Sequence, residues 1–229
     1  MSDFIHELKH DHHVIQQVIA GMSAVAELLD SGKQVDPSVL ADLVQFLRVF
    51  ADRCHHEKEE QHLFPLLDTK ANVSTRRELE SLEREHRSAK QLVGQLAKVA
   101  AVYVHNPAAV RYRIIDLLQQ LAELYPAHIW KEDFLLFPLA QQTLSTTEQE
   151  ALHEKFEDVE REVGEDVHAG FEMLAKKLEA VVEYRNTGAC PLCSSAARAM
   201  YGRPLLGTAR RHTISLPRCT AVENTWFSR

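Results

Sequence analysis

The sequence predicts an all-α protein, namely an antiparallel up-down-up-down four-helix bundle with an additional C-terminal helix and a weakly ordered tail. Glycine and proline are scarce through the first 186 residues. Hydrophobic residues there recur at steps of three and four, which is the period of an amphipathic helix. Short polar breaks divide this region into long stretches, and short connections between long helices require antiparallel neighbours.

Five helical stretches are expected, with ends good to about 2–4 residues: 3–30, 37–69, 75–105, 107–142 and 147–184. The breaks between them contain turn residues and helix-capping residues, with proline near the first helical position after two of them. The fifth stretch has one apolar stripe, which we expect to pack on the bundle or to form a homodimer contact. The predicted divisions are a bundle over 1–145, a helix over 146–186 and an arginine-rich tail over 187–229.

The composition is that of a globular protein and argues against several classes. Of the 229 residues, 45% are hydrophobic and 26% are charged, which excludes a fully disordered chain. No apolar run approaches the ~20 residues of a membrane helix, and the first residues show no secretory signal, so we expect a cytoplasmic protein with no membrane partner. A net charge of −7 argues against nucleic acid as a partner, since phosphate binding needs a basic face.

Histidine is unusually frequent, with 13 in the chain and 11 of them before residue 154. Each of the first four stretches carries one histidine on its apolar, inward face: His12, His55, His86 and His128. The second and fourth stretches add Glu59 and Glu132 one turn later, and residues i and i+4 share a helix face. Counted from the breaks, the four histidines differ in height by at most about one turn. Six polar side chains are therefore expected to converge in one layer of the core.

Such a layer is costly in a bundle core unless something compensates for its burial. One interpretation is a hydrogen-bonded polar layer. The repeated His-x-x-x-Glu spacing favours the other interpretation, a metal site, because metal sites require clustered buried imidazoles and carboxylates. Mixed nitrogen and oxygen ligands without thiolate suit iron, manganese or zinc. Two inward glutamates can bridge two cations, so a dinuclear site is the more natural expectation.

The strings around these residues resemble the hemerythrin family in its bacterial HHE cation-binding form. They are LKHDHHVIQQVI (8–19), CHHEKEEQHLFPLL (54–67), LEREHRSAKQLV (82–93) and HIWKEDFLLFPLA (128–140). The His-x-x-x-Glu-Glu/Asp-x-x-x-Phe-Pro spacing occurs at both His55 and His128, which favours His55 with Glu59 over His56 with Glu60. The resemblance covers about residues 3–142 and implies a four-helix bundle that holds two non-haem iron ions with a bridging oxygen.

Carried over residue by residue, the resemblance implies His12 and His55 on one iron, His86 and His128 on the other, and Glu59 and Glu132 as bridges. Oxygen-carrying members place a further histidine one turn after the third helix's ligand, where this chain has Lys90. His56 is our candidate for that fifth imidazole. We expect it to join His12 and His55, which would leave the open position on the other iron.

Members of the family bind dioxygen, sense oxygen or iron, or respond to nitric oxide and peroxide. The resemblance therefore implies a protein that binds or senses one of these small ligands. The alternative is a diiron oxidoreductase or a stress-response protein that repairs iron–sulfur centres. No substrate-pocket motif supports catalysis, so we expect a binding protein rather than an enzyme.

Two further features of the sequence have competing interpretations. Glu60 is interpreted as part of a charged helix face rather than as an acceptor for a ligand imidazole. In the tail, Cys190 and Cys193 form a Cys-x-x-Cys pair. With His212 and Cys219 this pair could make a zinc site, or it could form a redox disulfide, but a free tail is the favoured interpretation.

Overall fold

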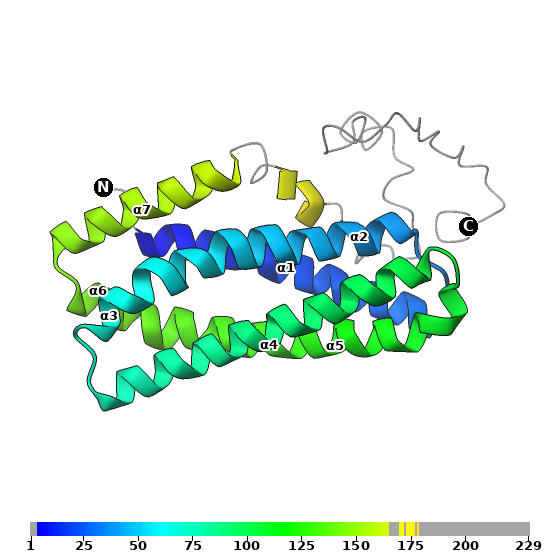
Figure 1. Ribbon diagram of the computed structural model, residues 1–229, viewed down its shortest axis with the longest axis horizontal. Helices are drawn as coiled ribbons and strands as arrows, with labels where there is room; N and C mark the ends of the chain where they lie inside the picture. The colour runs from blue at the N-terminus through cyan, green and yellow to red at the C-terminus, as the bar shows by residue number, and fades with distance from the viewer. Residues whose placement is uncertain (1–3, 165–169, 172, 177, 179–229) are drawn as a thin grey trace.

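A computed structural model of the chain describes residues 4–164, 170–171, 173–176 and 178. The helical elements up to residue 143 form four long rods. These rods run along the long axis of the molecule, and the helix over 146–163 lies beside them (Figure 1). The described residues form helices and turns and no strand. The predicted all-α class is therefore confirmed.

The four rods are built from several helical elements. In chain order the described elements are α1 (Phe4–Asp30), α2 (Pro37–Phe46), η1 (Leu47–His56), η2 (Glu59–Leu63), α3 (Phe64–Asp68), α4 (Val73–Tyr103), α5 (Pro107–Lys131), η3 (Glu132–Leu136), α6 (Phe137–Thr143) and α7 (Thr146–Val163). The η segments are π-helical. The second rod runs from α2 to α3 and the fourth from α5 to α6. Contacts of α5 with α1 and α4, and of α4 with α2 and η1, close the four rods into a bundle.

The breaks between the rods contain the capping interactions that the sequence predicts. A carboxylate oxygen of Asp36 accepts a hydrogen bond of 2.8 Å from the backbone N–H two residues later, at the start of α2. Asn72 and Asn106 accept from the backbone three residues later, at the starts of α4 and α5. Ser145 and Glu148 cap the start of α7 reciprocally. Each such cap stabilises its helix by about 1 kcal/mol, which fixes where each rod begins.

The two rods with the repeated His-x-x-x-Glu spacing depart from α-helical geometry at that spacing. The π-helical segment η1 ends at His56, η2 begins at Glu59 and η3 begins at Glu132. Wider π-helical turns occur frequently at functional sites. The sequence predicts plain α-helices here, because a hydrophobic period read over a few residues does not distinguish the two geometries.

A polar layer divides the apolar core into two clusters. The larger cluster contains most inward residues of α1, α2 and α5 and the second half of α4. The smaller one contains the start of α1, the α3 and α6 ends of the rods, the start of α4 and part of α7. The buried polar residues at the boundary are Asp11, His12, His55, His56, Lys58, Glu59, His86, His128 and Glu132. On every rod the predicted inward histidine falls at this boundary.

Helix α7 packs on the bundle, in contact with α1 and η1. Its buried side chains are Leu152, Phe156 and Val159. The ring of Phe156 meets that of Phe4 edge-on, with centroids 6.3 Å apart. This helix is shorter than the predicted stretch 147–184, because it ends at Val163, and the following Gly164 has a positive φ of 105°, a conformation that glycine adopts readily. The apolar side chains of α7 therefore pack against the chain's own bundle.

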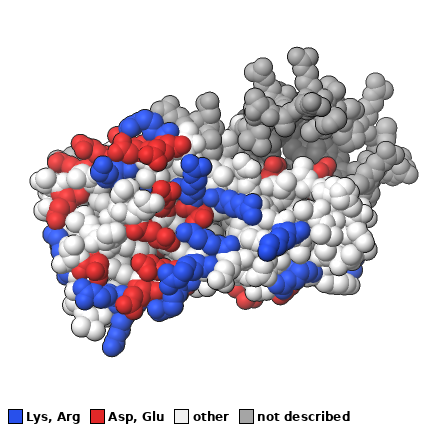
Figure 2. Space-filling view, viewed as in Figure 1, with Lys and Arg blue, Asp and Glu red and all other residues white. Residues whose placement is uncertain are grey.

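Charged side chains of both signs are interspersed on the surface. Figure 2 shows them gathered together over the half of this face that contains α3, α6 and α7. The predicted tail over 187–229 lies outside the described residues. In the part of the chain that the structure describes, no helix combines the length and the apolar character needed to cross a membrane.

Candidate metal centre

Seven of the buried polar side chains come from all four rods and are each at most 2% exposed. They are His12 from α1, His55 and His56 from η1, Glu59 from η2, His86 from α4, His128 from α5 and Glu132 from η3. These are the residues that the sequence analysis singled out. Burial without compensation would cost several kcal/mol for the carboxylates alone.

Six of the seven residues form two adjoining groups that share both glutamates. One group comprises His12, His55, Glu59 and Glu132, and the other comprises His86, His128, Glu59 and Glu132. Within each group the candidate ligand atoms lie within 4.8 Å of one another. A carboxylate shared by two neighbouring groups has the position that a ligand bridging two cations would need.

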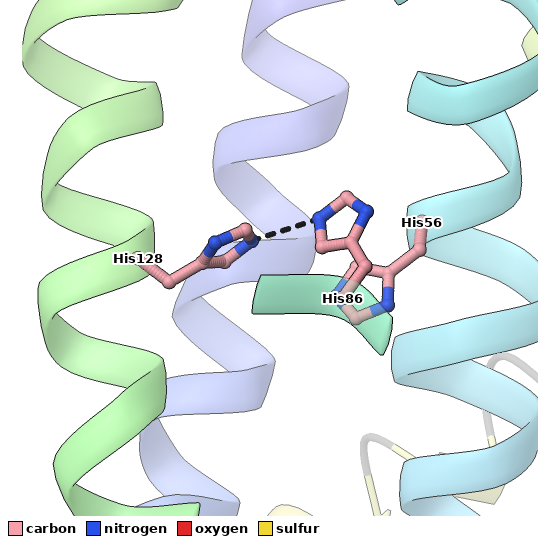
Figure 3. A group of neighbouring side chains, drawn as sticks. All are labelled: His56, His86 and His128. Atoms are coloured by element: carbon pink, nitrogen blue, oxygen red, sulfur yellow. Dashed lines mark hydrogen bonds between the residues drawn. The ribbon is translucent and has the colours of Figure 1, made fainter. Parts of the chain in front are cut away.

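His56 lies with the second group and not with the first. Figure 3 shows it beside His86 and His128, and the nitrogens of these three residues also fall within 4.8 Å. Its ring stacks on that of His86 with centroids 3.8 Å apart, whereas the ring of His55 meets that of His12, with centroids 4.6 Å apart. In the structure His56 therefore lies with His86 and His128, and not with His12 and His55 as the sequence led us to expect. Consecutive helical residues point about 100° apart, so His55 faces α1 while His56 faces α4 and α5.

Four of the five imidazoles donate their outer nitrogen, Nδ1, to a carboxylate. The pairs are His12 with Asp133 at 2.9 Å, His55 with Asp11 at 3.3 Å, His86 with Glu60 at 2.8 Å and His128 with Glu85 at 3.0 Å. Such an acceptor fixes the orientation of the ring and turns Nε2 toward the middle of the layer, where it could bind a cation. For His86 and His128 the two Nε2 atoms share a hydrogen bond of 2.9 Å, whose proton a cation would have to displace. The interpretation of Glu60 as a plain charged face is therefore wrong, since it accepts from His86. The remaining contact, between His56 and Asp52, is longer at 3.6 Å.

Most of the atoms that face the middle of the layer lack hydrogen bonds of suitable geometry. Among the described residues these are Nε2 of His12, His55 and His56, and both carboxylate oxygens of Glu59 and of Glu132. The exceptions are His86 Nε2 and His128 Nε2, which lie 2.9 Å apart and share a hydrogen bond. Several of the unbonded atoms are nonetheless close, for example His12 Nε2 at 3.2 Å from Glu132. Close polar atoms that converge without bonding each other are the donor set that a cation needs. The residues therefore fit a pair of metal ions.

The ionisation of these groups also favours a cation between them. Burial, and then the neighbouring Glu132, raises the pKa of Glu59 well above its ordinary value. Burial opposes ionisation of Glu132 as well, but His128 and two further histidines outweigh it and hold the pKa of Glu132 well below its ordinary value. The pKa of His128 rises to about 9, because Glu132 and another carboxylate outweigh burial. Burial and the neighbouring His12 lower the pKa of His55 to about 4. Without a cation, the pKa values of the two facing glutamates are therefore shifted in opposite directions.

Two buried residues next to this site, Asp11 and Lys58, are both 0% exposed and were not predicted from the sequence. Asp11 directly precedes His12, and Lys58 lies one turn after His55. The signal for Asp11 was its place beside a ligand candidate, where a carboxylate acceptor is common. Lys58 gave no such signal, since lysine is almost never fully buried unless it is paired.

A small cavity of about 140 Å³ opens beside the second group. Its lining includes His56, Tyr125, Gly94, Asp52 and Lys90. Lys90, which stands where oxygen carriers have a histidine, forms ion pairs with Asp52 at 3.0 Å and Glu60 at 3.5 Å. Its ammonium group thus forms ion pairs with the carboxylates that neighbour His56 and His86, and it does not point at the candidate ligand atoms.

Neither His13 nor Cys54, the neighbours of His12 and His55 in sequence, belongs to the groups of candidate ligands, and the tail cysteines lie outside the described residues. His13, next to His12 in sequence, is exposed. Cys54 is a buried free thiol, and burial raises its pKa to about 12. The tail pair Cys190 and Cys193 lies outside the described residues.

Comparison with known proteins supports this interpretation of the site. The family model of the hemerythrin HHE cation binding domain matches residues 3–140, which is more than half of the chain. That range contains all seven buried candidates.

Related proteins occur in mycobacteria. One from Mycobacterium bovis and two from strains of Mycobacterium tuberculosis, all three named as uncharacterized, are 25% identical over 175 residues. The match covers 75% of this chain and 66% of each relative, so the chain spans just under two thirds of their length. No solved structure matches the chain significantly.

Proposed function

The chain belongs to the hemerythrin HHE cation-binding family, and from that premise we propose that it is a non-haem diiron protein. Its partner would be dioxygen or another small ligand, such as nitric oxide or peroxide, which it binds or senses. The sensing of iron itself is the remaining variant of this role. Mixed imidazole and carboxylate ligands without thiolate favour iron, manganese or zinc, and the family implies iron among these.

The observation that supports the proposal is the set of convergent imidazole and carboxylate donor atoms around two shared glutamates, most of which have no hydrogen-bond partner. We assign His12 and His55 to one ion and His56, His86 and His128 to the other, with Glu59 and Glu132 between them. This assignment gives three imidazoles to one ion and two to the other. The open position would therefore lie on the ion held by His12 and His55, as in the oxygen-carrying members.

A bound ferrous pair would supply two electrons and one coordination position for a small ligand. The protein's own part is to hold the imidazoles and to exclude water. Phe137, which is buried, stacks on the ring of His12 with centroids 5.4 Å apart. Together with the smaller apolar cluster it gives the His12 side an apolar wall, which limits the access of protons and water to a bound ligand.

We further propose a binding role rather than repeated catalytic turnover, and a cytoplasmic location. The proposed divisions remain a bundle over 1–145, the helix over 146–186 and the tail over 187–229. A homodimer through the fifth helix would have to use other residues than Leu152, Phe156 and Val159, because these are buried within the chain. The competing proposal is an oxidoreductase or repair role, which the reaction of the reduced protein with dioxygen distinguishes from ligand binding.

The test is iron content and the absorption spectrum of the purified, iron-loaded protein, compared with His55→Ala and His128→Ala. We expect about two irons per chain in the wild type, and loss of most of the iron from each variant with helical content retained. His13→Ala is the matched control, since His13 is exposed and adjacent to His12. Full iron retention by both variants would refute the assignment.

Mixing the reduced protein with dioxygen then separates binding from catalysis. A stable absorption change that reverses when dioxygen is removed supports binding. Repeated dioxygen consumption with release of peroxide would instead support an oxidase.

A further inference from the structure

Lys58 is a fully buried lysine that is not itself a ligand in the proposed diiron site. It lies between η1 and η2 and is 0% exposed. Its ammonium group lies 2.7 Å from a carboxylate oxygen of Glu7, 3.1 Å from Asp11 and 2.7 Å from Glu160. Two of these acids are on α1 and the third is on α7. A single buried cation therefore holds three carboxylates from two other helices.

The same cluster reaches the candidate metal centre through one oxygen atom. Oδ2 of Asp11 accepts from Lys58 Nζ at 3.1 Å and from His55 Nδ1 at 3.3 Å. Asp11 is 0% exposed, so no solvent competes for it. Contacts thus run without interruption from Glu160 on α7 to the imidazole proposed for the ion with the open position.

The lysines on the other side of the centre differ in this respect. Lys90 pairs with Asp52 and Glu60, and Lys131 pairs with Glu85. Both ammonium-bearing side chains are partly exposed, at 42% and 29%, and their partners lie within the four rods. The cluster around Lys58 is the one that connects α7 to a candidate ligand, among the residues that the structure describes.

Burial of this ion cluster is not explained by stability alone. Three carboxylates around one ammonium leave an excess of negative charge, and well-packed apolar residues are often as stable as a buried ion pair or more so. A carboxylate behind a ligand imidazole, by contrast, orients that ligand and typically contributes 10–100-fold to metal affinity.

Given the proposed diiron function, on which this step rests, we propose that Lys58 and Glu160 are positioning residues for the metal centre. They fasten α7 to the bundle and hold Asp11 against His55. Retention of the ion between His12 and His55 therefore depends on α7. By linkage, binding of that ion must stabilise the docking of α7 by the same free energy.

The test uses the full chain loaded with two equivalents of Co²⁺ and challenged with excess chelator. Glu160→Gln keeps a hydrogen-bonding amide but removes the charge that ties α7 to Lys58. We expect one of the two ions to leave about tenfold faster and the other to leave at the wild-type rate. Glu154→Gln is the matched control, because Glu154 is an exposed glutamate on the same helix, and it should change neither rate.

Lys58→Met is the stronger perturbation, because it leaves three carboxylates to repel one another and pushes Asp11 away from His55. It should also release one ion selectively, whereas Lys90→Met should accelerate the release of the other ion. Hydrogen exchange supplies a second measurement: adding metal should slow amide exchange in α7 of the wild type but not of Glu160→Gln. Equal acceleration of both ions, or unchanged release of both, would overturn the inference.

Nitrogen NMR of the metal-free protein separates this inference from the proposed function. The His55 Nδ1–H signal should be protected from exchange in the wild type and in Glu154→Gln, and it should lose protection in Lys58→Met. If the wild type binds fewer than two ions, the diiron proposal fails, and the His55 signal still decides whether Lys58 positions that imidazole. An unchanged signal in Lys58→Met would refute the positioning role.

Discussion

The ring of His56 stacks on that of His86, with centroids 3.8 Å apart and planes inclined by 17°. Its neighbour in sequence, His55, faces His12 on the opposite side of the polar layer. Under the proposed function, this divergence would give a third imidazole to the ion held by His86 and His128. Where the family resemblance implies a further histidine this chain has Lys90, and His56 of η1 would supply that imidazole instead.

Double variants test the assignment of His56. If it shares an ion with His86, the His56→Ala/His86→Ala protein should retain about as much metal as His86→Ala alone, because neighbouring changes at one site are not additive. His56→Ala combined with His12→Ala should lower the affinity of the chain for both ions. Metal content after a fixed time with chelator measures this. The reverse pattern would return His56 to the ion of His12 and His55.

Glu59→Gln should affect stability and metal binding in opposite directions. Burial and the facing carboxylate of Glu132 raise the pKa of Glu59. Glu59 is ionised in the unfolded chain at neutral pH, so folding without metal costs free energy because the folded state disfavours the ionised form. The amide removes that cost, and we expect the metal-free variant to be more stable by about 1–3 kcal/mol in urea. It should also fail to bind two ions.

The matched control for this prediction is Glu57→Gln, which alters an exposed hydrogen bond with Gln61 and should change neither quantity. A Glu59→Gln variant that is less stable without metal would mean that Glu59 serves a hydrogen-bonded polar layer. That outcome would favour the non-metal interpretation of these residues.

The sequence predicts the composition of this layer well because helical periodicity is local. His12 and His55 can be brought level by counting residues from one turn, and the i, i+4 rule then places Glu59 on the same face. The direction of His56 could not be obtained this way, because it depends on how η1 is rotated against α4. Lys58 was missed because its burial depends on Glu160, 102 residues away.

Metal-free stability should depend on pH through His128. Glu132 and Glu85 outweigh burial and raise the pKa of this imidazole to about 9 from an ordinary value near 6.5. The folded state therefore binds the proton more tightly than the unfolded state does. The resulting stabilisation is fully present below about pH 6.5 and is lost as the pH rises through about 9.

Urea unfolding from pH 6 to 10 measures this dependence. The stability difference between the metal-free wild type and His128→Asn should shrink across that range, while the difference between wild type and His13→Asn should stay constant. Metal binding must also displace the His128 proton, so calorimetry at pH 7.5 in buffers of different ionisation enthalpy should detect proton release. A stability difference independent of pH would contradict the raised pKa.

Two glycines in helix interiors should respond oppositely to alanine. Alanine is favoured over glycine inside a helix by about 0.5–1 kcal/mol. At Gly94 in α4 an added Cβ would meet no atom within 4 Å, so Gly94→Ala should raise the free energy of unfolding by about that amount. At Gly21 in α1 the Cβ would lie 2.5 Å from Cβ of Leu178.

Neither of those Cβ atoms can move without its backbone, so overpacking at Gly21 should outweigh the gain in helix propensity. Gly21→Ala should therefore lower the free energy of unfolding, by about 1–2 kcal/mol net. Thermal unfolding of both single variants and of the double variant measures the contrast, and the two effects should add because α1 and α4 carry the sites in different surroundings. Stabilisation by both alanines would show that Leu178 does not pack closely on α1.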